Sequence, residues 1–224
     1  MRNTALIVGL QMAAMASGCV SPQQSPPLAS GDRYVAMGSS FAAGPGIPDY
    51  YEEPARPCAR SSNNYAHQIA RRHGLTLDDV SCSGATTFHL TGPRDAIPPQ
   101  LDAVNAETRL VTITIGGNDL GYMTKLFAAS CAGLAEQGIP PAAACDPIQP
   151  APSEQAYADL SARMDAIAKE VRRRAPAARL VFVDYLTVLP PAGICAATPL
   201  GSSEASKIRE IASRLAIITA KAAA

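Results

Sequence analysis

The stretch RLVTITIGGND, residues 109–119, carries the clearest structural signal in the chain. Residues 109–115 are rich in β-branched side chains, and Gly116 and Gly117 close the run. β-Branched residues favour strands and glycines favour tight turns, so the stretch predicts a strand over residues 109–115 followed by a turn. Three shorter runs have the same character and also predict strands: residues 33–38, 75–81 and 179–185.

Helix-like segments separate these strands. Apolar side chains recur at helical spacing over residues 62–73, 153–174 and from 203 onward, and Gly74 and Pro176 follow two of these segments where helices end. Strands that alternate with helices indicate βαβ units, so we expect a layered α/β domain around a parallel sheet. Ligands of such sheets bind beyond the carboxyl ends of the strands, which directs attention to the turns that follow.

Composition narrows the class of protein. The 224 residues fit one domain, and an apolar share of 47% is that of a folded chain rather than a disordered one. The 19 basic and 19 acidic side chains balance, so the chain lacks the positive field of a non-specific nucleic-acid binder. No apolar run reaches the ~20 residues that a membrane-spanning helix needs.

The first 19 residues have the pattern of a bacterial signal peptide. Small residues before Cys19 resemble a lipobox, although Ala16 stands where leucine is usual. Lipidation of Cys19 and ordinary cleavage after Ala16 both stay open, and either places the protein outside the cytoplasm; a buried helix is the remaining interpretation. The Pro-, Ser- and Gln-rich residues 20–30 predict a flexible tether, which leaves residues 31–224 as the folded domain.

An oxidising compartment favours disulfides. Besides the lipobox cysteine, sequence order suggests the pairs Cys58–Cys82 and Cys131–Cys145, although order alone does not fix connectivity. Each pair would close a short loop and stabilise the fold by about 3 kcal/mol. Cys195 is left without a partner, which fits a free thiol, an intermolecular bridge or a missing segment.

The turns after three of the predicted strands carry complementary chemistry. They span residues 38–46, 81–87 and 116–119 and contain glycines, serines and an asparagine. A serine on a tight turn is an exposed nucleophile, and a glycine lets a backbone N–H approach a reacting oxygen. An asparagine amide adds a donor without charge. Together these groups are the parts of acyl transfer through a tetrahedral oxyanion.

The same turns carry a family resemblance. YVAMGSSFAAGPG (34–46), SCSGATT (81–87) and IGGND (115–119) resemble, in order and spacing, three blocks of the SGNH (GDSL-type) hydrolase family, in its secreted, disulfide-bearing branch. The resemblance implies a three-layer α/β/α fold with a central parallel sheet of flavodoxin-like kind. The first block lacks the second glycine of the α/β-hydrolase elbow, which disfavours that fold.

The resemblance also implies roles for individual residues. Ser40 matches the nucleophile, and Gly84, Asn118 and the Ser40 N–H match the donors to the oxyanion. Ser39 stands where the family usually has aspartate, beside the nucleophile. The resemblance implies neither a cofactor nor a metal.

A serine nucleophile needs a general base, which in the family is a histidine of a fourth block with an Asp-x-x-His motif followed by proline. None of the three histidines here has that context. His67 and His73 fall on the predicted helix 62–73, where we expect one to face solvent and the other to lie at the helix end. His89 is expected to bond within its own loop, with the role of substitute base as the alternative. Asp119 is expected to cap the helix that starts there.

The missing partner of Cys195 and the missing base for Ser40 lead to one hypothesis, a C-terminally shortened SGNH hydrolase. The sequence predicts a secreted or lipid-anchored esterase or lipase, impaired by the absent histidine, that acts on a small-molecule, lipid or sugar ester. The alternative is a non-catalytic envelope protein that binds carbohydrate or acyl chains on the same scaffold. We expect a monomer with no nucleic-acid partner and with membrane attachment only through a lipidated Cys19.

Overall fold

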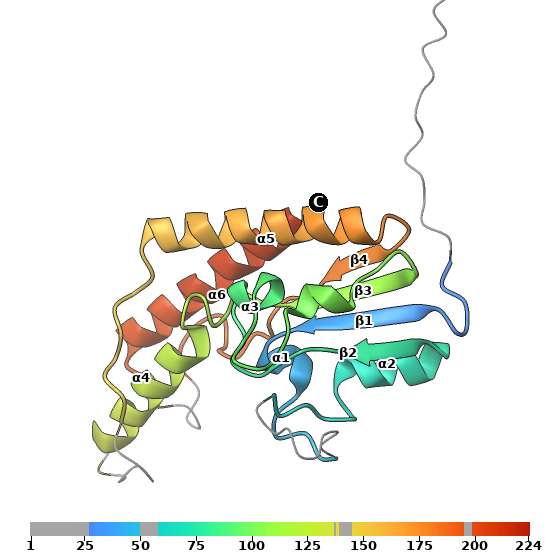
Figure 1. The fold of residues 1–224 in the computed structure, drawn as a ribbon. Coiled ribbons are helices and arrows are strands. Elements are labelled where there is room, and N and C mark those ends of the chain that lie inside the picture. The colour runs from blue at the N-terminus through green and yellow to red at the C-terminus, as the bar shows by residue number, and fades with distance from the viewer. Residues whose placement is uncertain (1–26, 50–57, 137, 139–144, 195–198) are drawn as a thin grey trace, which may run out of the picture.

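The computed structural model describes residues 27–49, 58–136, 138, 145–194 and 199–224. Within these residues strands and helices alternate along the chain (Figure 1). In chain order the elements are β1 (Arg33–Gly38), α1 (Ser40–Ala43), α2 (Tyr65–His73), β2 (Thr76–Asp79), α3 (Phe88–Thr91), the 3₁₀ helix η1 (Gln100–Ala103), β3 (Thr108–Thr114), α4 (Tyr122–Glu136), α5 (Glu154–Arg174), β4 (Arg179–Phe182) and α6 (Ser202–Ala223).

The strands of the described residues form one parallel sheet in the order β2-β1-β3-β4. This confirms the parallel sheet that the sequence predicts. The central strands β1 and β3 pair along their length, and their last residues, Gly38 and Thr114, are partners. The turns that follow β1 and β3 therefore begin side by side at the carboxyl edge of the sheet.

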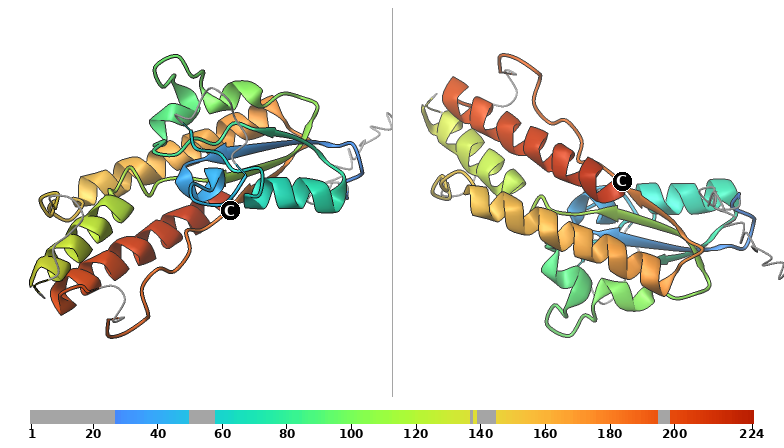
Figure 2. Two further views of the ribbon diagram at one scale, coloured as in Figure 1. Left: turned by 90° about the horizontal axis from the view of Figure 1, so that it is seen from below. Right: turned by 90° about the horizontal axis from the view of Figure 1, so that it is seen from above.

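Helices cover both faces of this sheet. Alternate residues of β1 point to opposite faces, as in any strand. Val35 and Met37 belong to the larger core, which includes α5 and α6, whereas Tyr34 and Ala36 belong to a smaller core under α2. Figure 2 shows α5 and α2 on opposite sides of the sheet, with α4, α5 and α6 extending past its carboxyl edge. The three-layer α/β/α arrangement is therefore confirmed.

Side-chain caps decide where two helices begin. The Asn64 side chain accepts from the N–H of His67, so α2 begins at Tyr65 rather than at residue 62. Ser153 caps α5 in the same way, at the predicted start of that helix. The sequence predicts a helix that starts near Asp119 but not the extent of α4, because the apolar side chains surround this helix instead of marking one face.

Two strands are shorter than predicted. β2 ends at Asp79, whose carboxylate accepts from both the N–H and the hydroxyl of Ser81 and closes a turn. β4 ends at Phe182, and after one more bond, from the N–H of Val183 to the sheet, the chain leaves the edge. Tyr185, predicted as the last residue of that strand, thus lies in the loop beyond it.

Both predicted disulfides are present, Cys58–Cys82 and Cys131–Cys145. The first joins the segment before α2 to the turn after β2, and the second joins α4 to the segment before α5. Cys195 lies outside the described residues.

The amino-terminal predictions fall mostly outside the described part as well. The signal-like residues 1–19 are not described, and of the predicted tether only residues 27–30 are. In this piece Leu28 packs against the smaller core. Among the described helices, none combines the length and hydropathy that a membrane span requires.

Candidate active site

The turn after β1 carries the predicted nucleophile. β1 ends at Gly38, the buried Ser39 follows, and Ser40 begins the short helix α1 and is partly exposed. Gly38 has a φ of 135°, and a Cβ there would lie 2.3 Å from the carbonyl oxygen of Thr114. Only glycine lets β1 turn so close to the backbone of β3.

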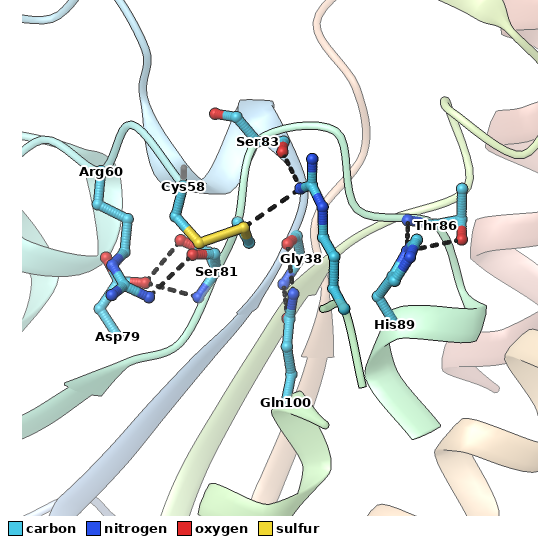
Figure 3. The surroundings of a disulfide bond; sticks show 11 residues. Gly38, Cys58, Arg60, Asp79, Ser81, Ser83, Thr86, His89 and Gln100 are labelled. Carbon is cyan, nitrogen blue, oxygen red and sulfur yellow. Dashed lines mark hydrogen bonds between the residues drawn. A yellow bond between two sulfur atoms is a disulfide. The ribbon is translucent and has the colours of Figure 1, made fainter. Parts of the chain in front are cut away.

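A buried glutamine from η1 holds the same turn. The Gln100 amide accepts from the N–H of Gly38 (2.7 Å) and donates to its carbonyl (3.0 Å) (Figure 3). Only 3% of Gln100 is exposed. A buried amide that satisfies both backbone groups of one residue fixes the conformation there, two residues before Ser40.

Hydrogen bonds also join the three turns to one another. The turns after β1 and β2 meet through Cys82 N–H and Gly38 O (3.0 Å), and those after β1 and β3 through Ser39 N–H and Thr114 O (2.9 Å). The turns after β2 and β3 meet through the Asn118 amide and Ala85 O (2.8 Å). The prediction that these turns converge at one edge of the sheet is confirmed.

Among the donors on these turns that have no acceptor in the described part of the chain are the N–H of Ser40, the N–H of Gly84 and one N–H of the Asn118 amide, which has two and gives one to Ala85. Gly84 is exposed with a φ of 82°, which glycine adopts freely, and Asn118 is partly exposed. The three turns thus combine a hydroxyl with three uncommitted N–H groups, the set that stabilises a tetrahedral oxyanion.

The Gly84 turn is anchored on both sides. Cys82 is joined to Cys58, and the N–H of Ser83 donates to the carbonyl of Cys58 (3.0 Å). The Arg94 guanidinium donates to the carbonyl of Ser83 and to Cys82 Sγ, the latter at 3.3 Å (Figure 3). These contacts hold the backbone of Gly84 without using its own N–H.

The loop after β4 supplies a residue that the sequence analysis missed. The Tyr185 hydroxyl lies 2.8 Å from Ser39 Oγ and accepts from the N–H of Gly117 at 3.0 Å. Burial raises the pKa of Tyr185 to about 12, so the phenol is protonated at neutral pH. The strand-end rule, applied to the fourth strand as well as to the first three, would have pointed to this residue.

The sequence predicts that Asp119 caps the helix that follows it, but the structure shows that it does not cap α4. Its carboxylate accepts from the N–H of Thr87 (3.0 Å) and from the Thr87 hydroxyl, and Arg163 lies 3.6 Å away. The chain makes further turns after Asp119 before α4 starts at Tyr122, which places this carboxylate beside Thr87 at the start of α3 instead.

None of the three histidines hydrogen-bonds to Ser40 in the described part of the chain. His89 accepts at Nδ1 from the N–H of Thr86 (3.0 Å), within its own loop as expected (Figure 3). His73 is exposed at the end of α2, also as expected. His67 faces the sheet rather than solvent: its Nε2 lies 3.7 Å from Asp79, and burial lowers its pKa despite that carboxylate.

Removal of the Gln100 clamp is expected to weaken the fold. Gln100→Leu leaves the N–H of Gly38 buried and unpaired, which costs about 1–3 kcal/mol of unfolding free energy. Urea unfolding followed by circular dichroism measures this loss. Gln68→Leu, the same change at an exposed site, should stay within about 0.5 kcal/mol of the parent. Equal losses in the two variants would contradict a special role for the buried amide.

The chain is similar in sequence to lipases of Streptomyces. The chain is 34% identical over 182 residues to Lipase 2 of Streptomyces coelicolor, covering 78% of this chain and 58% of that lipase. It is 32% identical over 216 residues to a lipase of Streptomyces rimosus, covering 94% of this chain and 73% of the relative. The chain thus spans less than two thirds of the length of the first relative.

Solved structures show the same fold. The extracellular lipase of Streptomyces rimosus superposes with a TM-score of 0.66 at 30% identity, over 85% of this chain and 75% of the other. The phospholipase A1 of Streptomyces albidoflavus superposes with a TM-score of 0.65 at 26% identity, over 87% and 76%. The sequence profile of the GDSL-like lipase/acylhydrolase family matches residues 36–224, the region that holds all three turns. The chain therefore belongs to the GDSL-like lipase/acylhydrolase family.

Proposed function

We propose that the chain carries the catalytic scaffold of a carboxylic ester hydrolase. Ser40 is the nucleophile, and the N–H groups of Ser40, Gly84 and Asn118 bind the oxyanion. The observation that carries this proposal is the set of three uncommitted donors on turns that are bonded to one another and to the serine turn. Family membership and the lipases among the relatives support an ester as the substrate.

The proposed reaction runs in two halves. Ser40 Oγ attacks the ester carbonyl carbon and gives its proton to a base, and the carbonyl oxygen becomes the oxyanion. The alkoxide leaves as an alcohol once it has taken up that proton, and the acyl group stays on Ser40. Water then attacks the acyl-enzyme through a second tetrahedral intermediate and releases the carboxylic acid. The same donors stabilise both oxyanions, which form only after attack.

The proton of Ser40 needs an acceptor, and none of the three histidines of the chain is placed to be that acceptor. His89 is engaged by Thr86, His73 points to solvent, and His67 faces Asp79. We therefore infer that this chain by itself turns over slowly. Serine hydrolases that lack a triad member keep about 10³–10⁴-fold acceleration over water from binding and the oxyanion hole.

The test compares the purified chain with Ser40→Ala on p-nitrophenyl butyrate. We expect weak hydrolysis that depends on Ser40, and labelling of Ser40 by a fluorophosphonate, located by mass spectrometry. Ser206→Ala, an exposed serine on α6, is the matched control and should leave both signals unchanged.

The outcomes separate the two candidate functions. Labelling of Ser40 with slow, Ser40-dependent turnover supports the impaired hydrolase. Rapid turnover would show that a base acts within this chain and would contradict the inferred impairment. Equal near-zero rates and no labelling, from proteins shown by circular dichroism to be folded, would favour the non-catalytic binding protein. The positions of the three histidines, away from Ser40, also support this alternative.

We further propose that the protein works outside the cytoplasm, free or anchored through Cys19. The signal-like residues 1–19 and the two disulfides support export. The Streptomyces rimosus lipase, described as extracellular, is a relative that supports the same location.

A further inference from the structure

The Tyr185 hydroxyl touches both turns that carry the proposed chemistry. It bonds to the side chain of Ser39, directly before Ser40, and to the N–H of Gly117, directly before Asn118. The Tyr185 hydroxyl oxygen thus lies between Ser39, the residue before the proposed nucleophile, and Gly117, the residue before the proposed amide donor. Tyr185 itself comes from neither turn but from the loop after β4.

The position of this contact along the third turn matters. The other two bonds between the turns after β1 and β3 run from the N–H (2.9 Å) and the hydroxyl (3.4 Å) of Ser39 to the carbonyl of Thr114, ahead of Gly116 and Gly117. The carbonyls of Gly116, Gly117 and Asn118 accept from N–H groups at the start of α4 and just before it, and these bonds do not reach the turn after β1. The Tyr185 contact lies after the first of these glycines, at Gly117, where it acts on the backbone next to Asn118.

We propose that Tyr185 is a positioning residue that sets the separation of the nucleophile turn and the Asn118 turn, an inference that rests on the proposed roles of Ser40 and Asn118. Its hydroxyl joins the side chain of Ser39 to the N–H of Gly117, two groups that do not bond to each other directly. Ser39, which stands where the family usually has aspartate, is the residue that receives this contact on the side of the nucleophile.

Aromatic packing holds the ring of Tyr185 in place. Its centroid lies 4.6 Å from that of Phe41 and 6.2 Å from that of Tyr122. A Cβ on Gly117 would lie 2.6 Å from the ring carbons of Tyr185, so the absence of a side chain there makes the approach possible. Since the ring is held by apolar packing, Tyr185→Phe removes the hydroxyl contacts and keeps the ring in place.

The experiment uses Tyr185→Phe, Gly117→Ala and the double variant. In Gly117→Ala the new methyl group would overlap the Tyr185 ring and push its hydroxyl away from this turn. This variant should therefore give the same defect. Tyr122→Phe is the control, because it removes a phenol hydroxyl from the ring that packs edge-on against Tyr185, and Ser39 and Gly117 bond to Tyr185 instead. The measurements are hydrogen exchange of the amide at position 117 by NMR, and the rate of Ser40 labelling by a fluorophosphonate.

We expect Tyr185→Phe to speed exchange at position 117 at least tenfold and to slow Ser40 labelling about 10–100-fold, the size of effect that a small misplacement of reacting groups produces. Where butyrate ester turnover is measurable, kcat should fall and KM stay unchanged. The double variant should be no worse than either single variant, because both remove one contact.

Two results would overturn the inference: exchange and labelling within twofold of the parent in Tyr185→Phe, or an equal defect in Tyr122→Phe. If Ser40 of the parent chain is not labelled at all, the proposed hydrolase function fails instead. The exchange measurement still decides in that case whether Tyr185 holds the Gly117 backbone.

Discussion

Replacing Asn118 by alanine is expected to slow reaction at Ser40 by about 10²–10³-fold, the usual cost of removing one oxyanion donor. The amide is well placed for this role, because its bond to Ala85 (2.8 Å) uses one N–H and fixes the direction of the other. The rate of Ser40 phosphonylation measures the effect, since the phosphoryl oxygen gains charge much as an ester carbonyl does. Butyrate ester hydrolysis gives a second measurement.

Two further variants make this prediction specific. Asn118→Asp keeps the size of the side chain and removes the donor, so it should be at least as slow as Asn118→Ala. Asn63→Ala removes an asparagine amide that bonds to Asp49 in an exposed loop, and it should leave the rate unchanged. A labelling rate in Asn118→Ala within threefold of the parent would remove Asn118 from the proposed oxyanion site.

Gly38→Ala is expected to be among the most destabilising single changes in the chain, with a loss of about 4 kcal/mol in unfolding free energy. The new Cβ would meet the Thr114 carbonyl at 2.3 Å, and the backbone would keep a φ of 135° that alanine rarely adopts. Backbone strain of this kind costs about 1–3 kcal/mol and overpacking about the same again. Urea unfolding measures the sum.

Gly31→Ala separates the two causes. Gly31 also has a positive φ, 87°, but a Cβ there would meet nothing within 4 Å. This variant should therefore lose only the strain, about 1–2 kcal/mol. If both variants lose the same free energy, the contact with Thr114 is not what makes Gly38 necessary.

The sequence predicts the scaffold well because its signals are local. The β-branched run predicts β3 from seven residues alone. Ser153 and the glycine after α2 likewise mark helix ends within a few residues. The convergence of the three turns follows from a general property of parallel sheets, so it too can be predicted from short segments.

The contacts that orient the site are not local. Gln100 acts on Gly38 across 62 positions, and Tyr185 acts on Ser39 across 146. No pattern distinguishes Gln100 from an ordinary loop side chain, and the strand-end rule points to the segment of Tyr185 but not to the contacts of its hydroxyl. β4 illustrates the same limit, because its apolar run continues to Tyr185 while the strand stops at Phe182, where pairing with β3 ends.

The Cys58–Cys82 bond lies two residues from Gly84, so thiol chemistry acts on the turn that carries a proposed oxyanion donor. In a reducing host cytoplasm the cross-link would be open, and closing a loop of this length contributes about 3 kcal/mol in the chain-entropy model. The Gly84 turn would then lose its covalent link and keep only hydrogen bonds, to Cys58, to Arg94 and to the turns after β1 and β3. Protein produced in such a host would carry an intact Ser40 beside a loosened turn. If the proposed site and export both hold, the cross-link beside Gly84 closes only in the compartment where the cysteines oxidise, so export would also complete the proposed site.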